Sequence, residues 1–95
     1  QTLKIRANTQ WNYSYYPIIL KDEATLLRVQ KALNEEQIFP RRYFYPSLNT
    51  INYIEKTSMP ISESIAARIL CLPLYVGLKQ SQLESICKII NSSIL

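Results

Sequence analysis

Histidine is absent from the 95 residues, and glycine occurs only once, at Gly77. Without histidine the chain can form neither a Ser-His-Asp triad nor a Cys-His pair, which excludes the common forms of nucleophilic catalysis within it. One glycine is too few for a glycine-rich phosphate loop or a dinucleotide-binding fingerprint. The two cysteines, Cys71 and Cys87, lack the nearby partners that a zinc site needs. We therefore expect no catalytic residue and no metal ligand in these 95 residues.

Long apolar runs are lacking too. No segment approaches the roughly 18 uninterrupted apolar residues of a membrane-spanning helix, and nothing resembles a secretory signal. The cysteines stand in apolar surroundings, where unpaired cysteines of reducing compartments commonly pack as small hydrophobic residues. These features predict a cytoplasmic protein without membrane contact, and the length is that of one domain.

The charge balance is only mildly basic. Eleven Lys and Arg against seven Asp and Glu give a formal net charge of +4, and only Arg41 and Arg42 are adjacent. A nucleic-acid-binding face usually clusters its basic residues, so the charge gives little support for such a partner. The segment RRYFYPSL at 41–48 nevertheless places two guanidinium groups beside three aromatic rings. That arrangement suits a nucleic-acid base, and it also suits the sugar and diphosphate of a nucleotide-sugar.

Three short segments have the composition of strands. β-Branched and aromatic residues predict strands over 13–20 and 42–45, and the apolar sequence CLPL predicts a brief buried strand or an extended stop at 71–74. Pro17 cannot donate a backbone hydrogen bond, which predicts an edge strand or a bulge. Residues 47–60 lack a sustained period and are expected to form a loop.

Three helices are predicted from capping signals and apolar spacing. The first runs from an N-cap at Asp22 to near Glu36, and the second follows an N-cap at Ser62. The third begins at a capping box formed by Ser81 and Glu84. The acidic residues that bracket the first helix are expected to be solvated. This order predicts an α+β domain, with a small sheet of about three strands covered on one face by about three helices.

Three stretches together resemble one known family. They are NYSYYPIIL, the helix end LNEEQIFPRRYFYPSL, and the long stretch PISESIAARILCLPLYVGLKQSQLESICKII. From about Asn12 to Ile94, their order and spacing resemble the C-terminal small domain of the DegT-type, pyridoxal-phosphate-dependent sugar aminotransferases. The fold that this implies is that of the C-terminal domain of a fold-type I enzyme of this cofactor class.

The resemblance also implies an activity for a longer parent protein. Such an enzyme converts the keto group of a nucleotide-linked sugar to an amine and takes the nitrogen from an amino acid such as glutamate. Its pyridoxal phosphate (PLP) would be held by a preceding large domain, because none of the six lysines here stands in the family's cofactor motif. Residues 1–95 would be a single small domain, with 1–11 as the linker.

We expect this piece alone to bind no cofactor and to be inactive. The parent is expected to be a homodimer with no nucleic-acid or membrane partner.

The same resemblance yields candidate substrate-binding residues. Phe44 and Tyr45 match family positions that line the sugar pocket, and Asn12 opens a strand that approaches the same site. Asn49 stands where many relatives carry a histidine. Arg42 is a candidate on physical grounds, because a planar guanidinium can bind a diphosphate through two parallel hydrogen bonds.

A function of another class stays open from the residues alone. Tyr43 and Tyr45 could stack nucleic-acid bases, as aromatic residues do on the sheets of RNA-binding domains. The chain would then be a small α+β module that binds single-stranded nucleic acid, or one that binds a protein through apolar helix faces.

Overall fold

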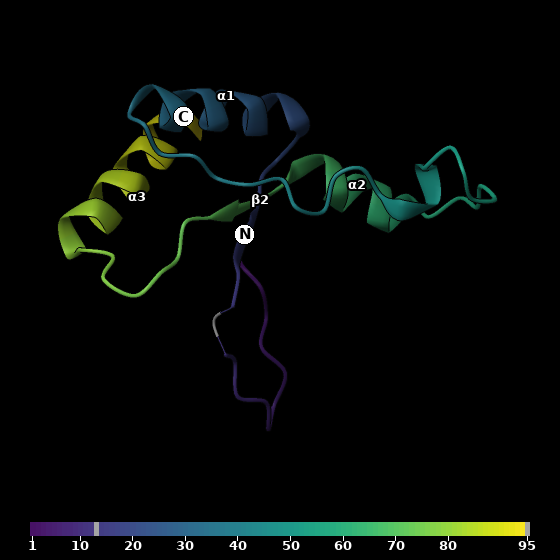
Figure 1. Cartoon of the computed structure of the whole chain (residues 1–95), viewed down its shortest axis with the longest axis horizontal. Helices are drawn as coiled ribbons and strands as arrows, with labels where there is room; N and C mark the ends of the chain where they lie inside the picture. The colour runs from purple at the N-terminus through teal and green to yellow at the C-terminus, as the bar shows by residue number, and fades with distance from the viewer. Residues whose placement is uncertain (13, 95) are drawn as a thin grey trace.

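The computed structural model describes residues 1–12 and 14–94, whose arrangement is shown in Figure 1. The elements are β1 (Tyr16–Ile19), α1 (Glu23–Glu35), a 3₁₀ turn (Leu48–Thr50), α2 (Pro60–Arg68), β2 (Ile69–Leu72) and α3 (Gln80–Ile94). Helices combined with a small antiparallel sheet confirm the predicted α+β class. Tyr13, where the first predicted strand begins, lies outside the described residues.

β1 and β2 form an antiparallel pair in which Pro17 lies opposite Cys71. Arg41 forms a single bridge to Cys71, and Thr2 forms one to Ile18 of β1. β1 is therefore close to the sheet edge, as its proline predicted. Cys71 exchanges both of its backbone hydrogen bonds with Arg41. The missing N–H of Pro17 consequently costs no bond between β1 and β2.

Among residues 1–12 and 14–94 the sheet has two strands where about three were expected, because residues 42–45 do not form one. The Tyr45 N–H donates to the Arg42 carbonyl at 3.4 Å and closes a turn. Backbone groups that would extend the ladder beyond Arg41 are therefore turned toward each other. The strand predicted at 71–74 is shifted, because β2 begins at Ile69 directly after α2 and ends at Leu72.

The predicted cap of α1 is confirmed. The Thr25 N–H donates to Asp22 Oδ1 at 2.7 Å and so satisfies a free donor at the helix start. Hydrogen bonds with Thr25 hold the pKa of the Asp22 carboxyl below its ordinary value. Leu26, Val29 and Leu33 face inward from this helix and are fully buried.

The predicted cap of α2 is wrong. This helix begins at Pro60, so Ser62 lies inside its first turn. Proline has no N–H to leave unsatisfied and its fixed φ suits the first helical position, which makes it a stronger start signal than the serine. The N-cap residue is Met59, whose side chain makes no capping bond, and Glu63 Oε2 accepts the Met59 N–H at 3.0 Å.

The capping box predicted for α3 is also wrong. The helix begins at Gln80, so Ser81 is already helical. Gln82 Oε1 accepts the backbone N–H of Lys79 at 2.9 Å, which places the cap at Lys79, ahead of the predicted Ser81. The start of the helix is thus set by the glutamine rather than by the serine hydroxyl.

The main core lies between the sheet, α1 and α3. Figure 1 shows α1 and α3 together at one end, with α2 reaching toward the other. None of the buried cluster's members within 1–12 and 14–94 comes from α2: they are Ile18, Leu20, Leu26, Val29, Leu33, Leu70, Ile86 and Ile90. The core therefore joins two helices to one sheet, and α2 extends beyond it.

The chain is elongated for its size. It measures 46 × 36 × 23 Å with a radius of gyration of 14.9 Å, whereas a compact domain of this length would have about 12 Å. The N-terminal residues and the loop before α2 project away from the core in Figure 1. Large apolar side chains stay exposed in that loop and in the first turn of α2, including Tyr53 at 84% and Ile61 at 81%. Apolar surface of this kind is usually covered in a larger assembly.

Candidate functional site

Residues 41–49, which we call the aromatic turn, hold four of the five predicted site residues. Arg41 fixes the start of the turn, because its backbone exchanges hydrogen bonds of 3.0 and 2.9 Å with Cys71 of β2. The chain then reverses through the turn from Arg42 to Tyr45. Tyr43, Phe44 and Tyr45 therefore lie beside the sheet, and their side chains do not point alternately to its two faces as they would in a strand.

Arg42 points into the protein and joins three elements. Its Nη2 lies 2.8 Å from Glu23 Oε2 at the start of α1, and it donates to the Ala67 carbonyl near the end of α2 at 3.2 Å. The guanidinium carbon sits 3.9 Å from the centre of the Tyr45 ring. The side chain is only 17% exposed, and its Nε is a buried donor without a hydrogen-bond partner among the described residues.

The aromatic rings gather on one side of this turn. The Tyr15 ring meets the rings of Tyr43 and Phe44 edge to face, with centroids 5.5 and 6.0 Å apart. This contact brings the chain before β1 next to the aromatic turn. The three rings remain about half exposed, so they form an apolar surface that a ligand or another protein segment can reach.

A cavity of about 770 Å³ lies between the aromatic turn and α2. Phe44 and Asn49 line it, whereas Asn12, Arg42 and Tyr45 do not. Its walls are mainly apolar: Tyr43, Phe44, Pro46, Ser47, Leu48, Asn49, Met59, Ile61, Ser62, Ile65, Ala66 and Ile69. Binding sites for small molecules are typically cavities of this size, with apolar walls and a few polar groups.

Asn49 holds the turn together through its amide. Its Nδ2 donates to the Thr57 carbonyl at 2.7 Å, and its Oδ1 accepts from the Ser47 hydroxyl. One N–H and one oxygen lone pair of the amide remain beyond these two bonds. Asn49 therefore shapes the loop and retains some capacity to bind a hydroxyl group.

Asn12 lies apart from these residues. Its Oδ1 accepts the Ser14 N–H at 3.1 Å, and the residue is exposed. The structure thus brings together Phe44 and Asn49 at the cavity and Arg42 and Tyr45 beside it, and it leaves Asn12 outside both groups.

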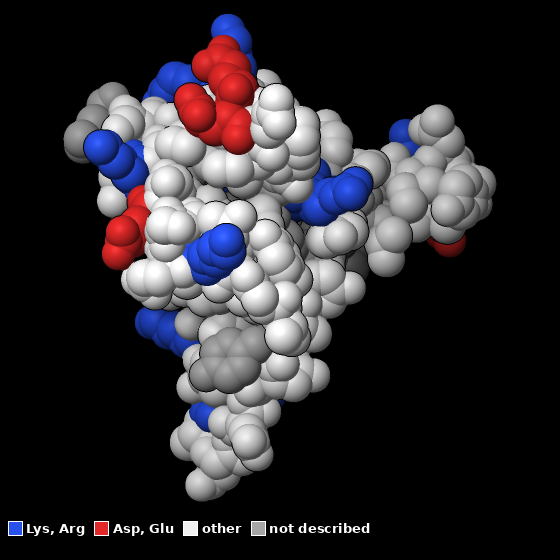
Figure 2. Space-filling model, turned by 60° about the vertical axis from the view of Figure 1, so that its left-hand side comes forward, with Lys and Arg blue, Asp and Glu red and all other residues white. Residues whose placement is uncertain are grey.

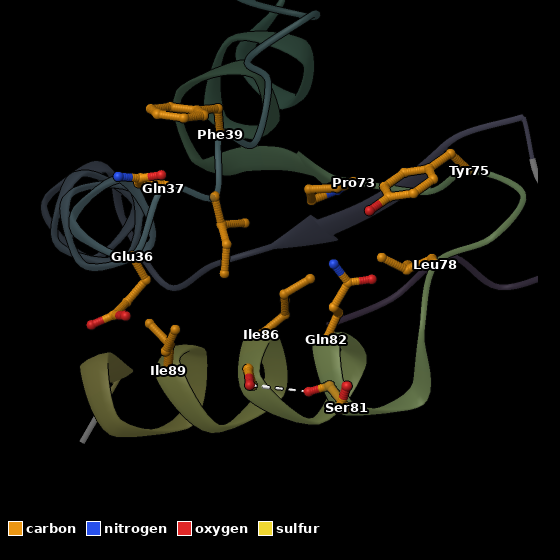
Figure 3. Close-up of a pocket in the computed structure, with 12 residues that line it drawn as sticks. Glu36, Gln37, Phe39, Pro73, Tyr75, Leu78, Ser81, Gln82, Ile86 and Ile89 are labelled. Carbon is orange, nitrogen blue, oxygen red and sulfur yellow. Dashed lines mark hydrogen bonds between the residues drawn. The ribbon is translucent and has the colours of Figure 1, made fainter.

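A second cavity of about 570 Å³ lies on another part of the molecule, between the end of α1 and α3. Figure 3 shows Gln82, Ile86 and Ile89 of α3 along one wall, with Phe39 and Tyr75 on the opposite side. None of the predicted site residues lines it. Of the predicted site residues, Phe44 and Asn49 line the first cavity, and none lines this one.

Sequence reasoning missed Glu23 and the contribution of α2. The acidic residues around α1 were expected to be solvated, but Glu23 pairs with Arg42, nineteen positions away in the chain. A helix and a loop separate the two, so no local pattern could reveal the pair. Met59 and Ile61 form cavity walls because the loop returns to the aromatic turn, which periodicity does not encode.

Burial raises the pKa of the Cys71 thiol above its ordinary value, which makes it a poor nucleophile. Across 1–12 and 14–94, no three His, Cys, Asp or Glu side chains gather as a metal site would require. No helix in this part of the chain is long and apolar enough to cross a membrane.

Comparison with known proteins identifies the family. The profile of the DegT/DnrJ/EryC1/StrS aminotransferase family matches residues 1–91. A dTDP-4-amino-4,6-dideoxy-D-glucose transaminase of Escherichia coli is 33% identical over 91 residues, which cover 87% of this chain and 24% of that protein. The transaminase of the same name from Shigella dysenteriae is 34% identical over 86 residues, covering 84% of this chain and 23% of that protein.

The chain thus spans about a quarter of the length of these curated relatives. No solved structure matches it. The match over nearly the whole chain agrees with the resemblance carried by its three stretches, and the chain belongs to the DegT/DnrJ/EryC1/StrS aminotransferase family.

Proposed function

We propose that this chain is the C-terminal small domain of a longer, PLP-dependent transaminase that acts on a nucleotide-linked sugar. The family match over residues 1–91 is the observation that carries the proposal. The names of the two relatives support a dTDP-linked 4-amino-4,6-dideoxy sugar as the product or the substrate. The amino donor would be an amino acid such as glutamate.

The residues of this chain do not fit the cofactor. All six lysines are exposed, and none of them lines either of the two larger cavities. PLP serves such enzymes as an electron sink, and it would be bound by the part of the protein outside these 95 residues. We therefore expect the isolated chain to be inactive. The homodimeric state and the cytoplasmic location of the parent stay predictions.

The aromatic turn is the proposed contribution to the substrate site. Phe44 and Asn49 would contact the sugar from the 770 Å³ cavity, because the apolar wall suits a deoxy position and the amide suits a ring hydroxyl. Tyr45 and Asn12 would approach from outside this cavity. Arg42 was a candidate for the diphosphate, but its guanidinium is already paired with Glu23.

The alternative of a nucleic-acid-binding module has less support. One face of the Tyr45 ring is covered by Arg42, and Tyr43 is packed edge-on against Tyr15. The face shown in Figure 2 carries basic side chains interspersed with acidic ones rather than a continuous basic patch. Tight binding of single strands usually needs open stacking surfaces along a basic groove.

The test uses the longer protein that carries this chain. Purified protein is incubated with dTDP-4-amino-4,6-dideoxy-D-glucose and 2-oxoglutarate, and mass spectrometry follows the conversion of the amine to a ketone. We expect turnover, together with a visible absorption band that borohydride abolishes. A colourless protein that leaves the sugar unchanged, but binds single-stranded DNA in a salt-dependent way, would refute the proposal in favour of the binding module.

A further inference from the structure

Arg42 is held from three directions, although it lies in a turn beside the sheet. The Glu23 carboxylate, the Ala67 carbonyl and the Tyr45 ring lie 2.8 Å, 3.2 Å and 3.9 Å from its guanidinium group. These groups belong to α1, to α2 and to the turn itself. A single side chain therefore connects the aromatic turn with the two helices that flank it.

The geometry of these contacts requires arginine. A guanidinium can stack its plane on an aromatic ring while its edge donates to a carboxylate and a carbonyl, and an ammonium group cannot do all three. Glu23 lies in the first turn of α1, where the helix dipole favours a carboxylate. Its side chain is 43% exposed and so keeps part of its hydration, whereas Arg42 at 17% depends on its partners.

The two residues next to the candidate cavity depend on this arrangement. Tyr45 stacks on the guanidinium, and its N–H donates to the Arg42 carbonyl. Phe44 lies between them in sequence and lines the cavity. If Glu23 were neutralised, the largely buried guanidinium would lose its counter-charge, while its Nε already lacks a partner among the described residues. The turn would then lose its fixed conformation.

We propose that Glu23 and Arg42 form a positioning pair. The pair itself does not touch the substrate, but it holds Phe44 and Tyr45 in the conformation that binds the nucleotide-sugar. This inference rests on the proposed transaminase function. It makes Glu23, a residue of α1 outside the cavity, a determinant of substrate binding. It also assigns Arg42 an indirect role in place of direct contact with the diphosphate.

The two roles of Arg42 predict opposite effects of Glu23→Gln. If Arg42 bound the diphosphate directly, removal of the competing carboxylate would free the guanidinium and would leave the KM for the nucleotide-sugar unchanged or lower it. If the pair positions the turn, the same substitution weakens the anchor and raises that KM. The substitution keeps the size and much of the hydrogen-bonding capacity of the side chain, so it tests charge more than packing.

The experiment measures steady-state kinetics on the longer protein with the nucleotide-sugar and the amino donor varied separately. We expect Glu23→Gln to raise the KM for the nucleotide-sugar about three- to tenfold. The KM for the amino donor should stay unchanged. Arg42→Lys should have a similar effect, and the double variant should be no worse than Arg42→Lys alone, because both changes remove one interaction. Glu35→Gln, which removes an exposed carboxylate from the other end of α1, is the matched control.

The outcomes separate the two proposals. An inactive wild-type protein refutes the proposed function. An active wild type in which Glu23→Gln matches the control, or lowers the KM for the nucleotide-sugar, overturns the positioning pair alone. Additive effects in the double variant also overturn it. Thermal unfolding is measured for each variant, and if Glu23→Gln does not fold, Glu23→Asp replaces it, since it keeps the charge but withdraws the carboxylate by one methylene.

Discussion

Replacement of Leu33 by alanine tests the core that supports the site. Leu33 is fully buried in α1 against the sheet and α3. Leu→Ala substitutions at such positions cost about 2–5 kcal/mol, because they remove buried apolar surface and leave a cavity. A domain of this size has a total stability of about 5–15 kcal/mol. A loss near the middle of the range would therefore remove a large part of the stability of the chain.

Leu27→Ala is the matched control, because Leu27 lies on the same helix but is 50% exposed. Its truncation leaves almost no cavity, so the free energy of unfolding should fall by no more than about 1 kcal/mol. Both variants have the same change in helix propensity, and only burial separates them. The comparison thus isolates the packing of α1 from its intrinsic helicity.

Urea unfolding of the 95-residue chain, followed by circular dichroism, measures both effects. With a slope of about 1.5 kcal/mol per molar urea, a loss of about 3 kcal/mol lowers the Leu33→Ala midpoint by about 2 M. The slope itself should not change. Equal midpoints for the two variants would contradict the packing described here, because they would mean that α1 does not bury this face.

Three further predictions concern local features. Asp22→Asn keeps an acceptor for the cap but removes its titration. Because the pKa of Asp22 is lowered from 3.8, the wild-type chain should lose stability as the pH falls from 3.8 through the lowered pKa. The variant should lose less stability over the same pH range. Acid titration followed by circular dichroism measures both losses. Gln82→Ala should lower the free energy of unfolding by about 0.5–1 kcal/mol, whereas Ser81→Ala should leave it nearly unchanged. A larger loss for Ser81→Ala than for Gln82→Ala would instead support the predicted capping box. In thiol labelling of the native chain, Cys87 should react and the buried Cys71 should not, and equal rates would contradict the burial of β2.

The helical part of the fold was readable from the sequence. Asp22 begins α1 as predicted, because an N-cap is satisfied within one turn of its own chain. Leu26, Val29 and Leu33 follow at helical spacing and reach the core as expected. The caps at Ser62 and Ser81 were wrong because a proline and a glutamine nearby offered competing start signals of the same local kind. Local rules therefore located helices to within a turn.

The candidate site was predictable only in part. Phe44 and Asn49 were singled out from a resemblance between sequences, and the structure places both in the wall of one cavity. The segment 42–45 has the composition of a strand, but it forms a turn because Arg42 is drawn into the protein. Strand propensity describes side chains that suit a half-buried pleated surface, and it does not fix whether a partner strand continues beside them.

The sequence by itself determined the three helices, the buried stripe of α1 and the family, because these follow from spacing and residue identity along the chain. Only the tertiary structure decided that Glu23 pairs with Arg42 and that α2 closes a cavity over the aromatic turn. These features join residues far apart in sequence. Their formation depends on how the packed core orients α1 and the sheet, and no local pattern contains that orientation.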